Sequence, residues 1–258
     1  MSRLVILGSA NAIPSPEHEN THLALRGESG TVLIDCVGSP IIRLERAGIE
    51  LDSISDLIAT HFHPDHVSGI PSLLMTMWLT GRQAPLRIFG LHHCLERLED
   101  MMGFYHWENW PNFFPVAFHR LPEREHVLVL EKEDYRVFSY PVRHLVPTIG
   151  LRLESASGEG WVGYSCDTEP CPALARLANG VQILLHEASG EGPGHSSASQ
   201  AGGMARQAEV SRLMLIHYPT RGISEEQLIA EARGAYEGPV ELARDFLEIP
   251  LPPTSGGG

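Results

Sequence analysis

Four potential metal ligands fall within six consecutive residues, His61-Phe62-His63-Pro64-Asp65-His66. The segment directly follows the apolar run 57–60, which is predicted as a buried strand. Because proline disfavours helix at the residue before it, we expect an extended loop at the end of this strand. His61 and His63 are two residues apart in extended backbone, so their side chains point to the same side. The segment therefore requires a fold that gathers polar side chains at one end of a buried strand.

The second half of this segment offers a second metal position beside the first. Asp65 and His66 lie where the next helix begins and can turn away from the two preceding histidines. Imidazole and carboxylate ligands suit Zn²⁺, and also Mn²⁺ or Fe²⁺, and the absence of cysteine favours a catalytic over a closed structural site. The alternative is a helix start capped by Asp65 with exposed histidines, which seldom concentrates so many potential ligands.

Further candidate ligands stand singly at the ends of later predicted strands. They are His144 after 135–142, Asp167 after 161–164 and His217 after 213–216. Taken alone, each is more often a turn residue or a hydrogen-bonded histidine. Taken together with the first segment, they complete the ligand set of a site for two metals.

Apolar runs rich in Val, Ile and Leu alternate with helical patterns along the chain. Strands are predicted at 3–7, 22–26, 31–35, 57–60, 86–89, 117–121, 127–130, 135–142, 149–153, 161–164, 181–185, 213–216 and 240–246. Helices are predicted at 40–47, 67–79, 92–102, 171–179, 198–208 and 225–235. Two sets of strands with helices outside each set predict a layered α/β sandwich.

Length and composition agree with a single globular domain. The chain has 258 residues, 43% of them hydrophobic and 20% charged, which excludes disordered and fibrous classes. Because no linker, repeat or charge block interrupts it, we expect one domain over residues 1–251 and a disordered tail over 252–258. No apolar run approaches the roughly 18 residues that span a bilayer, so we expect a cytoplasmic protein without a membrane partner.

Cysteine spacing and net charge argue against three further classes of protein. Cys36, Cys94, Cys166 and Cys171 form no CxxC pair, so we expect reduced, buried thiols rather than a disulfide framework or a zinc ribbon. The chain has 19 Lys and Arg against 32 Asp and Glu, a net charge of −13. This charge disfavours a basic nucleic-acid binder and leaves room for a small anionic substrate at a locally positive site.

Motifs spread over almost the whole chain carry a family resemblance. They are Leu7-Gly8-Ser9-Ala10 with Pro14 and Asn20, Leu33-Ile34-Asp35-Cys36, the segment 61–66, Ser165-Cys166-Asp167-Thr168, His186-Glu187-Ala188-Ser189, the segment 194–201, and Leu215-Ile216-His217-Tyr218 with Arg221. In these motifs the chain resembles the metallo-β-lactamase-fold hydrolases and, within them, the ribonuclease Z branch. The resemblance implies a four-layer αβ/βα sandwich.

The resemblance also implies an activity and assigns the metal ligands. It implies a dinuclear zinc-dependent phosphodiesterase that attacks its substrate with a metal-bridging hydroxide. One zinc would be bound by His61, His63 and His144, and the other by Asp65, His66 and His217. Asp167 would bridge the two ions.

Four residues receive roles in catalysis or in support of the ligands. We expect Asp65 to orient the attacking water and accept its proton. The resemblance implies that His195 binds the phosphate and assists the leaving group, although a histidine in a Gly/Ser loop is otherwise a surface residue. His186 and Glu187 are expected to support the site by holding a ligand imidazole in the right tautomer, and direct catalysis by Glu187 is the weaker alternative.

The chain departs from ribonuclease Z in one respect. The tRNA-processing members carry a long arm between the third and fourth motifs, but only about 22 residues separate His144 from Asp167 here. We therefore expect a small or flexible phosphodiester as substrate and disfavour tRNA. The aromatic stretch 101–114 contains no Lys or Arg, and it is either a wall over the metals that stacks a base or an aryl group, or a hydrophobic plug or subunit interface.

Three alternatives to this function stay open. The first is a tRNA 3′-processing endoribonuclease with a nonstandard exosite. The second is a lactone or thioester hydrolase of the same fold, and the third is a non-catalytic member, which the intact ligand set disfavours. The resemblance also implies a homodimer.

Overall fold

The strands at the centre of the protein are buried on both faces. In strand β1 (Arg3–Gly8), Leu4 and Ile6 pack into a core that contains residues from the whole molecule, while Val5 and Leu7 pack against helices. Because successive side chains of a strand point to opposite faces, this burial requires a layer on each side of the strand. The computed structural model describes residues 2–251, so the expected tail at 252–258 lies outside the described residues.

The first half of the chain, together with one strand from the C-terminal segment, builds one sheet and its helices. The sheet has seven strands in the order β14-β1-β2-β3-β4-β5-β6. Its other strands are β2 (His22–Gly27), β3 (Gly30–Ile34), β4 (Ile54–Ile58), β5 (Leu86–Leu91), β6 (Val116–Leu121) and β14 (Glu248–Pro250). The helices are α1 (Pro40–Arg46), α2 (Pro64–Val67), α3 (Ile70–Leu79) and α4 (His92–Gly103), with short 3-10 turns at Leu51–Ser53 and Trp107–Asn109.

The second half builds an equivalent pair of layers. Its sheet has seven strands in the order β13-β12-β11-β10-β9-β8-β7. These are β7 (Val127–Glu131), β8 (Tyr135–Val142), β9 (Thr148–Ser155), β10 (Gly160–Tyr164), β11 (Ile183–Glu187), β12 (Arg212–Ile216) and β13 (Val240–Leu242). Helices α5 (Pro172–Ala178), α6 (Ala198–Gln207) and α7 (Glu225–Arg233) cover its outer face.

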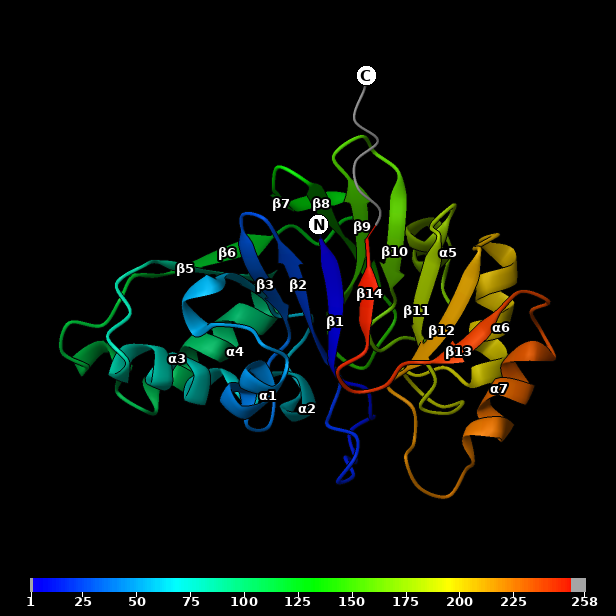
Figure 1. The fold of residues 1–258 in the computed structure, drawn as a ribbon, viewed down its shortest axis with the longest axis horizontal. Coiled ribbons are helices and arrows are strands. Elements are labelled where there is room, and N and C mark those ends of the chain that lie inside the picture. Colours follow the sequence, from blue (N-terminus) through cyan, green and yellow to red (C-terminus); the bar gives the residue numbers. More distant parts are fainter. Residues whose placement is uncertain (1, 252–258) are drawn as a thin grey trace.

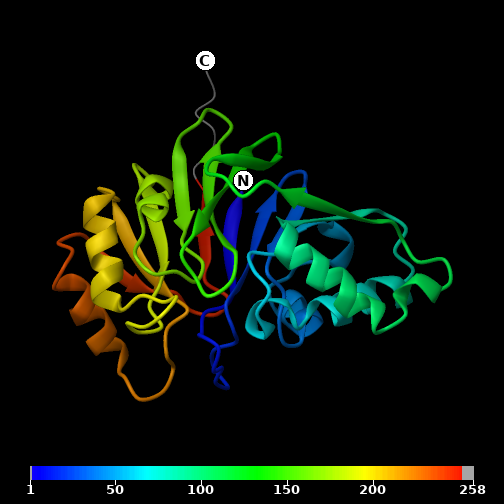
Figure 2. The same cartoon turned by 180° about the vertical axis from the view of Figure 1, so that it is seen from behind.

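The layers follow the order helix, sheet, sheet, helix. Helices α1–α4 lie at one side of the molecule and α5–α7 at the other, with the strands between them (Figures 1 and 2). The central core joins residues of both sheets, among them Leu4 of β1 and Leu151 of β9. The predicted four-layer αβ/βα sandwich is confirmed.

Several predicted boundaries were wrong, and two of them change the environment of predicted site residues. In place of the predicted helix 67–79 the chain forms α2 over 64–67 and α3 over 70–79, because Pro71 has no N–H to donate to Val67 and cannot continue the first helix. Strand β11 ends at Glu187 rather than at 185, so His186 and Glu187 are strand residues with opposite faces. The predicted strand 240–246 ends at 242, and β14 follows it.

The aromatic stretch lies away from the metal-binding segment. Trp110 stacks on Trp78 of α3 with ring centroids 4.8 Å apart, and Trp78 Nε1 donates to the backbone oxygen of Pro111. Figures 1 and 2 place this green segment at the outer end of the first half, far from α2. The stretch closes the outer end of the helix layer and does not cover the metal-binding segment.

Two expectations from composition can be compared with the described residues. Over residues 2–251, no helix has the length and apolar character needed to cross a membrane. All four cysteines are free thiols, and Cys36, Cys94 and Cys166 are buried while Cys171 is half-buried.

A buried ion cluster ties the two sheets together, and it predicts an effect on stability. Asp56 of β4 is fully buried and accepts from Arg87 Nε at 2.6 Å, and Lys132 Nζ, next to β7, lies 2.9 Å from its carboxylate. We expect Asp56→Asn to lower the free energy of unfolding by about 3 kcal/mol, because two cations lose their partner. Urea denaturation at pH 7 measures this difference.

The same cluster predicts how that difference changes with pH. Burial raises the pKa of Asp56, but the hydrogen bonds from Arg87 and Lys132 outweigh burial and the net pKa is below its usual range. A carboxylate with a depressed folded pKa stabilises the fold above its unfolded pKa of about 3.9 and loses this contribution as pH falls through the folded value. The difference between wild type and Asp56→Asn should therefore shrink in acid, and a constant difference would contradict this.

Candidate metal centre

Loops from both sheets converge on one cluster of imidazoles and carboxylates. The segment 61–66 follows β4 of the first sheet, and the other three candidates follow strands of the second sheet: His144 after β8, Asp167 after β10 and His217 after β12. A hydrogen bond from Ile149 N to Thr60 O, 3.2 Å long, joins the two sheets beside the cluster. The structure brings all seven predicted ligands together at this place.

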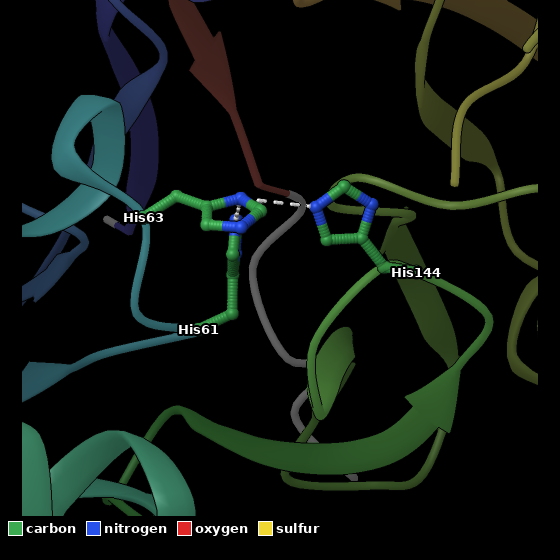
Figure 3. A group of neighbouring side chains, drawn as sticks. All are labelled: His61, His63 and His144. Carbon is green, nitrogen blue, oxygen red and sulfur yellow. Dashed lines mark hydrogen bonds between the residues drawn. The ribbon is translucent and has the colours of Figure 1, made fainter. Parts of the chain in front are cut away.

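Three imidazoles form the first group of the cluster. His63 Nδ1 lies 3.1 Å from His61 Nε2 and 3.1 Å from His144 Nε2, and the three rings point toward one another (Figure 3). Asp167 Oδ2 lies 3.9 Å from the Nε2 atoms of His61 and His144. Two sheets therefore supply one compact set of four donor atoms.

The second group of donor atoms also includes the carboxylate of Asp167. Asp167 Oδ2 lies 3.5 Å from His66 Nε2 and 3.3 Å from His217 Nε2. Asp65 Oδ2 lies 3.7 Å from His66 Nε2 and 3.9 Å from His217 Nε2. Asp167 is 2% exposed, and its Oδ2 lies within 3.9 Å of nitrogen atoms in both groups.

The chemistry of the cluster fits divalent metal ions. A tetrahedral ion about 2.0–2.1 Å from each donor separates its ligands by about 3.3 Å, close to the spacings observed. Within residues 2–251, His66 Nε2 and Asp167 Oδ1 are buried without a hydrogen-bond partner, which is costly unless a cation satisfies them. Burial lowers the pKa of His61, His63 and His144, which keeps their imidazoles neutral with a lone pair for a metal.

Hydrogen bonds at Nδ1 orient the imidazole rings of His144, His61 and His66. His144 Nδ1 donates to the backbone oxygen of Gly194 at 2.7 Å, which leaves its Nε2 lone pair toward the cluster. Gly194 has φ +79°, and a Cβ there would lie 2.8 Å from His144 Nδ1, so only glycine fits. His61 Nδ1 lies 3.2 Å from Thr60 Oγ1, and His66 Nδ1 lies 2.7 Å from Asp35 Oδ2.

Asp35 is a site residue to which we assigned no role from the sequence. It follows β3, is fully buried and has a left-handed φ of 59°. Its carboxylate accepts from Thr60 N at 2.8 Å and from Thr60 Oγ1 at 2.7 Å, besides contacting His66. The available signal was its position at the end of an apolar run, the same signal that identified Asp167.

Glu187 holds His195 beside the cluster. The fully buried Glu187 carboxylate accepts from His195 Nδ1 at 3.1 Å and from the backbone N–H groups of Thr168, Ser189 and Ser196. The hydrogen bond to Glu187 raises the pKa of His195. The His195 ring lies 4.9 Å from the His144 ring and is 28% exposed, so solvent reaches it. Glu187 therefore orients an imidazole outside the predicted ligand set.

His186 lies on the other face of β11. It shares this face with Leu184, which packs with the helices of the second half. Its Nδ1 lies 2.7 Å from the backbone oxygen of Glu187, and its Nε2 has no hydrogen-bond partner among the described residues. The structure does not bring His186 into the cluster.

Comparison with known proteins identifies the family. A family model described as a β-lactamase superfamily domain matches residues 31–218, most of the chain. The chain belongs to this superfamily. A ribonuclease Z from Methanothermobacter thermautotrophicus is 29% identical to it, with 96% of each chain covered.

Solved structures agree with this assignment at the level of the fold. The metallo-β-lactamase fold protein YhfI from Bacillus subtilis superposes with a TM-score of 0.81 at 17% identity, covering 96% of this chain and 98% of YhfI. The short form of human tRNase Z gives 0.77 at 23% identity, covering 98% and 100%. The chain is a metal-dependent hydrolase with a metallo-β-lactamase fold, and its cluster has the donor atoms that a divalent metal ion requires.

The contact between Asp35 and His66 predicts an effect on metal binding. We expect Asp35→Ala to weaken binding of a divalent metal about 10- to 100-fold, because the His66 ring loses the carboxylate that orients it. Metal content after dialysis against graded chelator measures this. Asp52→Ala, which removes an exposed carboxylate, serves as the control and should bind as the wild type. If Asp35→Ala and Asp52→Ala retain metal equally, Asp35 does not orient a metal ligand.

Proposed function

We propose that the protein is a dinuclear zinc phosphodiesterase of the ribonuclease Z type. The observation that carries this proposal is the shared oxygen of Asp167, which lies between two separate groups of donor atoms. His61, His63 and His144 would bind one ion, and Asp65, His66 and His217 the other. This donor set suits Zn²⁺, and it also accepts Mn²⁺ or Fe²⁺.

The charge of the site favours an anionic substrate. The carboxylates of Asp65 and Asp167 neutralise only part of the charge of two divalent ions, so the loaded site is positive within a chain of net charge −13. Two adjacent ions supply an activated water and bind the oxygens of a phosphoryl group. A phosphodiester matches both properties.

The chain's own residues supply the proton transfers. Asp65 lies in the first turn of α2 with 15% of its side chain exposed, where its carboxylate can orient the attacking water and take its proton. Glu187 accepts the Nδ1 proton of His195, so the Nε2 nitrogen at the opposite edge of the ring is available to the phosphate and the departing alcohol. His195 therefore serves as the residue that assists the leaving group.

The size of the chain supports a small or flexible substrate. Only β9 and β10 lie between His144 and Asp167, which leaves no room for an RNA-gripping arm there. The alignment with the Methanothermobacter ribonuclease Z spans 310 positions, whereas this chain has 258 residues, so at least 52 of them face gaps in this chain. A second candidate function, tRNA 3′-end processing with a nonstandard exosite, is favoured by the name of that relative.

One substrate panel tests these functions against each other. The zinc-loaded protein should hydrolyse bis-aryl phosphodiesters or cyclic nucleotides, lose this activity after chelation, and leave precursor tRNA intact. Cleavage of precursor tRNA at its 3′ end would favour the second candidate. Turnover of a lactone or thioester, without turnover of any phosphodiester, would contradict the proposal.

His195 and Asp167 have different proposed roles, so their alanine variants should differ in turnover and in metal content. We expect His195→Ala to keep both metals and to lose about 10²- to 10⁴-fold in turnover, because it removes only the group that assists the leaving alcohol. Asp167→Ala should instead lose metal, since both donor groups share its oxygen. Elemental analysis and phosphodiesterase assays on the same preparations measure both effects. Unchanged turnover in His195→Ala would remove this residue from the mechanism.

A further inference from the structure

His217 differs from the other buried histidines of the cluster in how its ring is held. Its Nδ1 is buried and has no hydrogen-bond partner among the described residues. In contrast, the Nδ1 atoms of His66 and His144 are bonded to Asp35 and Gly194. The direction of the His217 ring therefore depends on its backbone, which has a left-handed φ of 50°. Such a backbone persists in a non-glycine residue only where its surroundings fix it.

Two hydrogen bonds fix this backbone from opposite sides. His217 N donates to the backbone oxygen of Ser9 at 2.8 Å, and Ser189 Oγ donates to the backbone oxygen of His217 at 2.8 Å. Asn11 N also donates to the backbone oxygen of Tyr218 at 3.1 Å. The loop that follows β1 thus crosses from the first sheet to the second and pairs with the backbone that carries His217.

The carboxylate of Asp245 holds this loop in place. Asp245 lies just beyond β13, and its side chain is 5% exposed. It accepts from Ser9 Oγ at 2.7 Å, from Glu19 N at 2.9 Å and from the Arg43 guanidinium of α1. Glu19 O in turn accepts from Ala10 N at 2.8 Å. One buried charge therefore anchors the beginning and the end of the loop that supports His217.

We propose that Asp245 is a positioning residue for His217. Through Ser9, it holds the backbone geometry that points the His217 ring at Asp65 and Asp167. This inference rests on the two-metal proposal and adds to it that one metal position depends on the C-terminal segment of the chain. A purely structural Asp245, which only attaches that segment to α1 through Arg43, would affect stability and leave the two metal affinities unchanged.

Stepwise zinc affinities distinguish these two roles. The full-length apoprotein is titrated with zinc in competition with a chromophoric chelator, for the wild type and for Asp245→Asn and Ser9→Ala. Asp245→Asn removes the charge that pairs with Arg43 and puts an amide N–H in place of one acceptor oxygen. Ser9→Ala removes the hydroxyl that contacts the carboxylate and His18 Nδ1. His217→Ala identifies the affected ion. Asp56→Asn is the matched control, because it removes another buried, ion-paired carboxylate that lies outside the cluster.

The expected result is selective weakening of one ion. Asp245→Asn and Ser9→Ala should bind one equivalent as the wild type does and the other about tenfold or more weakly, and this equivalent should be the one lost in His217→Ala. Asp56→Asn should bind both as the wild type. If Asp245→Asn and Ser9→Ala bind both ions as the wild type, or Asp56→Asn is weakened equally, this inference is overturned. A wild-type protein that binds fewer than two equivalents overturns the two-metal proposal itself.

Discussion

The structure depends on a buried carboxylate placed among imidazoles. Asp167 Oδ2 lies within 3.3–3.9 Å of nitrogens from His61, His66, His144 and His217, all of them buried or nearly so. An isolated charge at this depth is expensive, and the buried polar atoms that find no partner in the described part of the chain add to that cost. Divalent cations relieve both costs, because they supply opposite charge and accept the free lone pairs. The cluster is thus a place where metal binding and folding support each other.

Both halves of the sandwich contribute ligands to the cluster. The first sheet contributes one dense segment, 61–66, whereas the second contributes three separate residues from three strand ends. A site built in this way requires that the two sheets keep a fixed relation. The central core, the Asp56–Lys132 ion pair and the crossing loop at Ser9 hold the sheets together at different points. Several contacts share this role, so the loss of one that lies outside the cluster is expected to lower stability without displacing the ligands.

The sequence predicts those parts of the site that depend on local patterns. The segment 61–66 concentrates its ligands in one loop, and His144, Asp167 and His217 each follow an apolar strand, so the structure brings together residues that the pattern had already selected. Glu187 was placed beyond its strand, and the two-residue error at the end of β11 hid which of His186 and Glu187 faces the cluster. Asp35 also ends an apolar run, but its role depends on a contact with His66, 31 residues away. The role of Asp245 depends on a contact with Ser9, 236 residues away, which no local pattern encodes.

We propose that two metal ions lie on either side of Asp167. Anomalous diffraction from crystals grown with zinc would locate each ion independently of any assay. We expect two peaks about 3.5–4 Å apart, one among His61, His63 and His144 and the other among Asp65, His66 and His217. A single peak, or two peaks that do not share Asp167, would contradict it.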